Sequence, residues 1–456
     1  MRIITNGLII LFFIFTGFAF ATSLEREIPT ETQWDLETPT TTLMQVRQQK
    51  TLYAFIGNKL RPVAELYPNQ GFYVSDEINN YHKIQFGNAQ GYLEAGYLEA
   101  GYLEDGYFED IASISADKKI RFLSDSTKKT DYPIYGYLIT TKNTPIYSDK
   151  DIASPQIATL LSNLRYPVLS RTIKEEANGS KINWFEISLG DRLGYISSRD
   201  VKPDLGIPIL TYHHILKATE NHKFRHTSTT TSLTAFTEQM NYLKEAGYET
   251  LSLNQVAGYL NKSINLPGRA VALTFDDGLQ SVYRYAYPLL KENGQRATLF
   301  VISSRIKSKT SKWAPNSLQF MSWQSLRSSR DVFDIQSHSH FLHRLDNNKK
   351  PIIFSRQSHT IILDLQRSQR VLSLLNPHQY AFAYPFGGYN QRAINAVKAS
   401  GMTLAVTTQQ GKVRLGDPPF ALKRLYALST DPIEKFARMV GNDEYEVVNK
   451  NIVVDK

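Results

Sequence analysis

Cysteine is absent from this chain, and its absence excludes several kinds of site at once. None of the 456 residues is a cysteine, so disulfide bonds, thiolate catalysis and cysteine-based zinc sites are ruled out together. A chain of this length is too long for one ordinary domain. We therefore expect at least two domains.

Long apolar runs are scarce as well, and the only prominent one lies near the N-terminus. A weakly basic start with Arg2 precedes the run Leu8 to Phe20, and Ala19-Phe20-Ala21 has the small-x-small pattern of a signal peptidase site. We predict that residues 1–21 are a cleaved signal peptide and that the protein is exported to the periplasm, cell envelope or medium. An uncleaved membrane anchor is the alternative, because the run is long for a signal peptide and short for a full span.

The basic charge is not gathered into basic runs. The formal charge of +9 would attract anionic polymers, including nucleic acid, acidic glycans or a lipid surface. Lysine and arginine are scattered, however, and the export signal argues against nucleic acid. We predict a solvated basic exterior, no nucleic-acid partner and at most a peripheral association with the cell envelope.

An internal repeat follows a segment with few apolar anchors, residues 22–50, which we interpret as a linker. Tyr81-His82-Lys83-Ile84 is followed by Gly87 and Gly91-Tyr92-Leu93, and Trp184-Phe185-Glu186-Ile187 by Gly190 and Gly194-Tyr195-Ile196. The same residue types recur at the same spacings. With short alternating strands, this predicts two small all-β barrels, at residues 51–120 and 132–203.

The repeated pattern resembles bacterial SH3-like domains, and the resemblance covers about residues 51–203. It implies binding to cell-wall peptides or glycans, or a pair of spacer domains without a ligand. Within the first module, Gly-Tyr-Leu-Glu units begin at Gly91, Gly96 and Gly101, and a Gly-Tyr-Phe-Glu unit at Gly106. A period of five suits neither a strand nor a helix, so we expect an exposed acidic and aromatic loop; a dedicated binding strip is the alternative.

From Gly206 onward, strands alternate with helices. Strands are expected at 208–212, 271–275, 297–302, 332–337, 380–386, 403–408 and 421–428. Helices are expected from Ser232 to Gly247, in a segment that ends near Gly294, and at 363–375 and 432–440. This alternation predicts an α/β domain at 207–440, a closed or partly closed, distorted TIM-like parallel barrel of about seven strands, with residues 441–456 as a tail. An open doubly wound sheet is the alternative.

Two carboxylates stand at the end of the strand expected at 271–275. Asp276-Asp277-Gly278 follows an apolar run, and the carboxyl ends of barrel strands are where such enzymes keep their chemistry. Adjacent residues of extended chain face different ways, so one carboxylate can bind a metal while the other acts as a base. An ordinary Asp-Gly turn is the alternative.

A histidine cluster follows the strand expected at 332–337. Three of the ten histidines of the chain, His338, His340 and His343, fall within six residues. One carboxylate with two imidazoles can hold a catalytic divalent metal and leave a position for water or substrate. His338 and His343 can converge only if the backbone turns between them.

A third motif, Phe382-Ala383-Tyr384-Pro385-Phe386-Gly387-Gly388, ends a further strand. Its turn could aim a backbone N–H at a developing oxyanion, or be a simple Pro-Gly turn.

In order and spacing, the three motifs resemble the polysaccharide deacetylases of the NodB homology family, over about residues 207–430. Tyr212-His213-His214-Ile215 and Ala297 to Val301 support the resemblance. It implies that Asp276 is the catalytic base. It also implies that Asp277, His338 and His343 bind a divalent metal, Zn²⁺ or a similar ion.

The five-residue gap between the two histidines and the form of the third motif resemble the branch that includes biofilm poly-N-acetylglucosamine deacetylases. The resemblance implies an N-acetylated glycan as partner, either poly-N-acetylglucosamine or peptidoglycan. It further implies an oxyanion donor at the Phe386 N–H. Substrate contacts are expected at His213, His214, Tyr384 and Pro385.

Two departures from the family pattern bear on activity. Ala383 stands where many relatives carry an arginine that supports the base, and no histidine follows His378, so the usual C-terminal general acid is missing. His213 or His214 could donate that proton. The rival function is a non-catalytic cell-wall-binding protein whose deacetylase barrel is degenerate.

Overall fold

The computed structural model describes residues 41–75, 77, 80–95, 98–100, 134–176 and 178–441. All of these belong to one compact unit, Thr40–Lys456. The predicted signal peptide, most of the linker, the tail, and the repeat units at Gly101 and Gly106 lie outside the described residues, as does the start of the unit at Gly96. Within the described part of the chain, no helix is long and apolar enough to cross a membrane.

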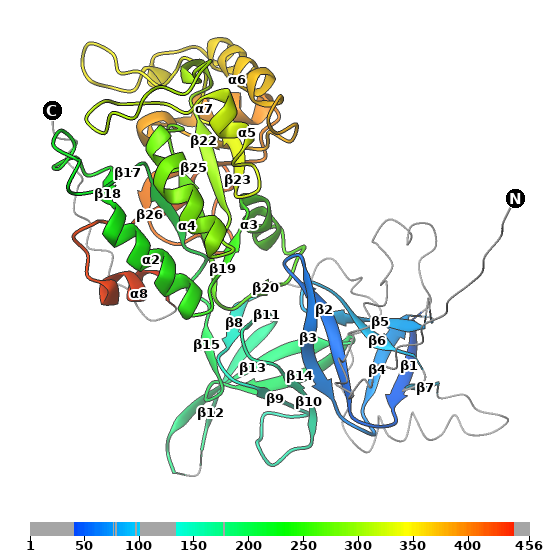
Figure 1. The fold of residues 1–456 in the computed structure, drawn as a ribbon. Helices are drawn as coiled ribbons and strands as arrows, with labels where there is room; N and C mark the ends of the chain where they lie inside the picture. Colours follow the sequence, from blue (N-terminus) through cyan, green and yellow to red (C-terminus); the bar gives the residue numbers. More distant parts are fainter. Residues whose placement is uncertain are drawn as a thin grey trace, which may run out of the picture. The chain divides into compact units, whose positions relative to one another are not determined.

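A closed parallel barrel forms the C-terminal domain (Figure 1). Its seven strands are β16 (Ile209–Tyr212), β21 (Ala270–Phe275), β22 (Ala297–Val301), β23 (Phe333–Ser337), β24 (Ala381–Ala383), β25 (Leu404–Gln410) and β26 (Leu422–Tyr426). The order is β16-β26-β25-β24-β23-β22-β21, every pair is parallel, and β21 pairs back with β16. The closure confirms the barrel and excludes the open alternative. A further strand, β19 (Glu249–Leu251), pairs with the first half of β21.

The helices lie outside this barrel and pack their apolar stripes against it. They are α2 (Leu233–Glu245), α3 (Leu253–Leu260), α4 (Tyr287–Glu292), α5 (Trp323–Arg327), α6 (Ser358–Leu372), α7 (Gln391–Ala399) and α8 (Ile433–Val440), with a π-helical turn, η2 (Val282–Ala286), before α4. The Ser232 side chain caps α2 as expected, since it accepts a hydrogen bond from the Ala235 N–H. The helix expected at 363–375 begins earlier, at Ser358.

Short elements complete this domain: β17 (His214–Leu216), β18 (Thr230–Ser232), β20 (Leu266–Pro267), η3 (Ser303–Arg305), η4 (Ile352–Phe354) and η5 (Pro385–Gly387). The strand expected at 380–386 is shorter than predicted and ends at Ala383. The chain turns there into η5, in which Phe386 has a positive φ of 56°. A residue in that conformation cannot continue a strand.

The N-terminal region is all-β, as predicted. Its strands are β1 (Thr41–Val46), β2 (Lys50–Ile56), β3 (Lys59–Leu66), β4 (Gly71–Ser75), β5 (Tyr81–Phe86), β6 (Ala89–Glu94), β7 (Leu98–Ala100), β8 (Gly136–Thr140), β9 (Thr144–Tyr147), β10 (Gln156–Leu160), β11 (Leu164–Val168), β12 (Ser170–Glu175), β13 (Lys181–Leu189), β14 (Arg192–Ser197) and β15 (Val201–Pro203). The likeness to SH3 domains stays a prediction.

The two repeats are joined edge to edge, a contact that the sequence did not predict. Strand β10 of the second repeat pairs with β3 of the first, and β13 pairs with β5. Twelve strands therefore form one continuous sheet. Buried side chains from both repeats, such as Phe72 and Ile146, belong to one apolar cluster. Joining the two edges covers strand edges that would otherwise be exposed.

The predicted boundary of the linker also needs correction. Residues 41–46, assigned to the linker, form β1, which pairs with β4. Val46 is fully buried. This single buried anchor, surrounded by Thr and Gln, is too weak a pattern to show as a strand in the sequence.

Candidate active site

The carboxyl ends of the barrel strands bring the predicted residues together. Asp276 and Asp277 follow β21, and His338 follows β23. One ligand atom from each of Asp277, His338 and His343 lies within 4.8 Å of the others. The Asp277 Oδ1 is 3.2 Å from the His343 Nε2 and 3.6 Å from the His338 Nε2.

A left-handed turn after β21 separates the two carboxylates. Asp277 and Gly278 both have a φ of 72°, a conformation that L residues other than Asn and Asp rarely adopt. Gly278 has little room, because an added Cβ would lie 3.2 Å from a Val301 methyl. The turn lets Asp276 face Arg424 while Asp277 faces the imidazoles.

The three grouped side chains fit a divalent cation. The Asp277 Oδ1 is buried and has no hydrogen-bond donor among the described residues. The His338 Nδ1–H donates to the Ala383 carbonyl oxygen at 2.8 Å, which leaves the lone pair on Nε2. Burial, aided by His343, lowers the pKa of His338 to about 4. Burial, aided by Arg305, likewise lowers the pKa of His343 to about 4. Both imidazoles are therefore neutral near pH 7 and can donate lone pairs to a cation.

Asp276 is held by a buried arginine that the sequence analysis missed. Arg424 of β26 donates from Nη1 and Nη2 to the two Asp276 oxygens, each at 2.8 Å. Its Nε–H donates to the Thr407 carbonyl oxygen. Burial alone would raise the pKa of Asp276, but the charge and hydrogen bonds of Arg424 outweigh it and hold that pKa well below its usual range. The support expected at position 383 thus comes from another strand.

The loop between the two histidines is tied down at its midpoint. Asp364 of α6 accepts hydrogen bonds from the His340 and Phe341 N–H groups, both at 2.7 Å. The chain doubles back there, so the rings of His338 and His343 lie 4.7 Å apart between centroids. The His340 ring instead pairs with the Ser303 hydroxyl at 2.9 Å, and it is not part of the metal-ligand group.

The two histidines after β16 have different surroundings. The His213 Nε2 is 3.7 Å from the Asp276 Oδ2, and its ring stacks on Tyr426. Its Nδ1 is buried without a partner among the described residues. His214 is buried, pairs through Nδ1 with the Ser281 hydroxyl at 2.7 Å and packs on Phe224. The enclosure of His214 does not favour the predicted contact with substrate.

The residues of the turn after β24 also differ in whether they are buried or exposed. Tyr384 and Pro385 are buried, and the Tyr384 hydroxyl donates to the Phe420 carbonyl oxygen, so neither side chain is open to a polymer. Phe386 is 45% exposed, and its ring lies 4.3 Å from that of His343. The Phe386 N–H has no acceptor among the hydrogen bonds of the described residues, whereas the next two N–H groups bond within the turn.

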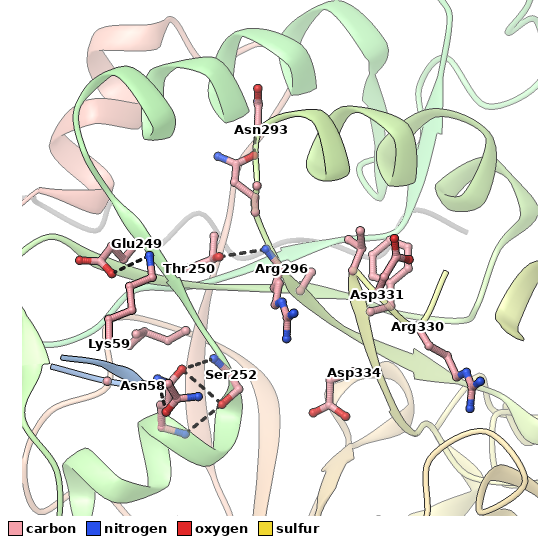
Figure 2. Close-up of a pocket in the computed structure, with 18 of the residues that line it drawn as sticks. Asn58, Lys59, Glu249, Thr250, Ser252, Asn293, Arg296, Arg330, Asp331 and Asp334 are labelled. Atoms are coloured by element: carbon pink, nitrogen blue, oxygen red, sulfur yellow. Dashed lines mark hydrogen bonds and ion pairs between the residues drawn. The ribbon is translucent and has the colours of Figure 1, made fainter. Parts of the chain in front are cut away.

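A large cavity lies at the other end of the barrel (Figure 2). It has a volume of about 980 Å³ and is lined by the starts of β19, β22 and β23 and by the β2–β3 turn. Its acidic groups have partners: Arg61 donates twice to Glu249, and the Tyr380 hydroxyl donates to Asp334. None of the grouped site residues lines it.

Comparison with known proteins decides the family of this domain. Residues 263–405 match the family model described as polysaccharide deacetylase. The C-terminal domain is a polysaccharide deacetylase domain. The matched range contains Asp276, Asp277, His338 and His343, whereas His213 precedes it and Arg424 follows it.

Several curated relatives of the deacetylase domain share one name. A poly-beta-1,6-N-acetyl-D-glucosamine N-deacetylase of Staphylococcus aureus (strain MSSA476) is 26% identical over 236 residues, which is 49% of this chain and 79% of the relative. One of Staphylococcus epidermidis is 28% identical and covers 47% of this chain and 69% of the relative. The structure of IcaB from Ammonifex degensii is 26% identical, with a TM-score of 0.44 over 52% of this chain and 96% of that one.

Proposed function

We propose that this chain is an exported, metal-dependent N-deacetylase that removes acetyl groups from a glycan containing N-acetylglucosamine. The observation that carries the proposal is the Asp277 Oδ1, buried without a hydrogen-bond donor between the Nε2 atoms of two imidazoles. The name of the curated relatives favours poly-β-1,6-N-acetylglucosamine as the polymer. Peptidoglycan and other cell-wall glycans are the alternatives.

Asp277, His338 and His343 would hold the ion, and two imidazoles with one carboxylate suit Zn²⁺. A bound divalent ion would supply Lewis acidity toward the acetyl carbonyl and would lower the pKa of water. The hydrogen bond from the His338 Nδ1 to the Ala383 carbonyl oxygen would hold that ring in its ligating orientation.

Asp276 would accept the proton of the water that attacks the acetyl carbon. Arg424 engages both oxygens of this carboxylate and so fixes its plane. The same contact keeps Asp276 ionised across the physiological range, because it holds the pKa well below its usual value. Ionisation and orientation let Asp276 accept a proton, but its low pKa makes it a weak base, so a bound ion would be needed to make the attacking water more acidic.

The remaining steps need an oxyanion donor and an acid. The Phe386 N–H, which has no acceptor among the described residues, would donate to the oxygen as negative charge develops on it. As the C–N bond breaks, His213 would give a proton to the leaving nitrogen, since its Nε2 lies beside Asp276. The products are acetate and a free amine on the glycan.

Acetate release tests this function directly. The full chain, reconstituted with Zn²⁺, is incubated with poly-β-1,6-N-acetylglucosamine and with peptidoglycan side by side, and Asp277→Ala is the control. Metal-dependent release from one polymer supports the enzyme and identifies its substrate. No release from either, with metal bound and glycan still retained on a column of the protein, would favour the wall-binding alternative.

The proposal that the protein is exported rests on residues 1–21 alone. We expect the mature chain to begin at Thr22 and to be found outside the cytoplasmic membrane. N-terminal sequencing of the protein from extracytoplasmic fractions tests this expectation, and recovery of the intact N-terminus in the membrane fraction would favour the anchor.

A further inference from the structure

A second cavity, of about 560 Å³, lies beside the histidine loop. Its walls are the segment that follows His343 and the first half of α6. Three arginines line it: Arg344, Arg356 and Arg367. All three are exposed.

None of these arginines appears in an ion pair among the described residues. Arg344 lies over the Phe341 ring, with its guanidinium carbon 5.5 Å from the centroid. A fourth arginine, Arg392, approaches the same place, because its Nη1 donates to the Arg356 carbonyl oxygen at 3.3 Å. The cavity therefore gathers three guanidinium groups against two carboxylates, those of Asp346 and Asp364, which leaves an excess of positive charge.

The two acidic residues that line the cavity are already engaged by the backbone. Asp364 accepts from the His340 and Phe341 N–H groups. Asp346 accepts from the Asn348 and Lys350 N–H groups, at 2.9 and 2.8 Å. Neither carboxylate bonds to a guanidinium of the cavity in the described hydrogen bonds. Arg367 lies near enough to Asp364 to favour its charged form, yet among the described residues no guanidinium of the cavity makes the two parallel hydrogen bonds to a carboxylate that arginine favours.

The cavity adjoins the catalytic residues. Arg344 directly follows the predicted ligand His343, and the Phe386 turn packs on the same loop, since a Cβ on Gly388 would lie 2.9 Å from Pro351. Phe341, at the cavity wall, is 44% exposed. An exposed aromatic ring beside charged donors can pack against the apolar face of a sugar.

We propose that this cavity binds a carboxylate carried by the glycan near the sugar that is deacetylated. The inference rests on the proposed deacetylase activity, and among its candidate substrates it favours peptidoglycan over the uncharged poly-β-1,6-N-acetylglucosamine, because a lactyl group or an attached peptide supplies the carboxylate. A concave cavity with three arginines in its lining suits a charged substituent that projects from a chain. A lipid surface would meet a flat or convex face instead.

Binding to a catalytically disabled chain tests the inference. Asp276→Asn is titrated by calorimetry with peptide-free peptidoglycan strands and with the same strands after their carboxyl groups are amidated. We expect the acidic strands to bind about tenfold more tightly or better, because a charge-assisted pair is lost on amidation. Adding Arg356→Gln and Arg367→Gln should bring the ratio close to one.

Arg327→Gln is the matched control, because this exposed arginine on α5 lies over the Trp323 ring, away from the cavity. It should leave the ratio at its parent value. A parallel titration with peptide-bearing strands distinguishes the sources: a larger preference there assigns the carboxylate to the peptide, and an equal one assigns it to the lactyl group.

Three results would overturn the inference: equal affinity for acidic and amidated strands, a preference that survives the arginine substitutions, or binding only to vesicles of anionic lipid. These results are separable from a failure of the proposed function. Absence of acetate release from every polymer would refute the proposed deacetylase activity, yet the arginine-dependent preference for acidic strands could still be measured. Strong acetate release without a preference for acidic strands would refute this inference alone.

Discussion

The two ends of the barrel differ in how completely their polar groups are satisfied. At the carboxyl ends of the strands, the Asp277 Oδ1 and the His213 Nδ1 are buried without partners among the described residues. At the amino ends, around the cavity of about 980 Å³, Glu249 is paired with Arg61 and Asp334 with the Tyr380 hydroxyl. The carboxyl end is therefore the more reactive one, because buried unpaired groups indicate where a ligand belongs.

The difference follows from the direction of the chain. In a parallel barrel, the loops at the carboxyl ends are free to vary, whereas the opposite end connects strands to helices and supports stability. Here the amino end also contacts the all-β region, where Gly57 donates to the Asn265 carbonyl oxygen and Arg61 pairs with Glu249. Polar groups at that end hold the two regions together.

The largest expected effect is at Asp276. We predict that Asp276→Asn lowers kcat/KM for acetate release by about 10²–10⁴-fold, because the general base is lost, while metal content is retained. Arg296→Gln, a change at the amino-end cavity, is the control and should alter kcat/KM less than twofold. Full activity in Asp276→Asn would contradict the assigned role and the contrast between the two ends.

A smaller effect is expected at Asp364, which touches no predicted ligand side chain but accepts from the loop between them. An asparagine can accept only through one atom, so one of the two N–H groups loses its acceptor. We predict that Asp364→Asn weakens Zn²⁺ binding by about 10–100-fold, as measured by chelator competition. Asp346→Asn, which affects only the next turn, should bind Zn²⁺ as tightly as the parent. Unchanged Zn²⁺ affinity in Asp364→Asn would show that the loop between the two histidines keeps its conformation without these two hydrogen bonds.

His214 gives a pH-dependent effect on stability. Burial lowers the pKa of His214 from 6.5 to about 4, so below pH 6.5 the unfolded chain binds a proton that the folded chain does not. The stability from this group is complete above pH 6.5 and is lost as the pH falls toward 4. Between pH 7 and pH 4.5, the free energy of unfolding of the parent should decrease. We predict that the decrease in His214→Gln is smaller by about 2–3 kcal/mol. Urea unfolding of the metal-free proteins measures this, with the exposed His222→Gln as control. Identical pH slopes in the parent and His214→Gln would refute the buried neutral form.

The smallest effect is expected at the amino end. Arg61 donates two hydrogen bonds to Glu249, at 2.7 and 2.8 Å, and both side chains are partly exposed. We predict that Arg61→Gln lowers the free energy of unfolding by about 1 kcal/mol and changes kcat/KM less than twofold. Thermal unfolding and acetate release measure the two quantities. A large loss of kcat/KM in fully folded protein would mean that the two ends are coupled.

The barrel was predictable because its strands are short apolar runs separated by helical patterns. Such runs are followed by Asp276, Asp277 and the two converging histidines. Because the strands of the barrel are parallel, residues that follow them lie at the same end of the barrel. The side chains of Asp277, His338 and His343 lie together at that end, as this reasoning predicted, and could hold a metal ion.

Contacts between segments that are distant in the sequence could not be predicted from these local patterns. Arg424 meets Asp276 from 148 positions away, and nothing in the local pattern of β26 specifies which carboxylate its arginine will face. The pairing of β10 with β3, which joins the two repeats, depends likewise on which sheet edges meet. Tyr384 and His214 looked accessible because they adjoin motif residues, yet packing encloses both.

Titration of the metal-free full chain with Zn²⁺ measures whether the protein binds a metal at the predicted ligands. We expect one tightly bound ion per chain, with binding lost in Asp277→Ala and unchanged in Arg296→Gln at the other end of the barrel. No tight binding in the parent, or binding of equal strength in Asp277→Ala, would contradict the assignment of the metal to Asp277, His338 and His343.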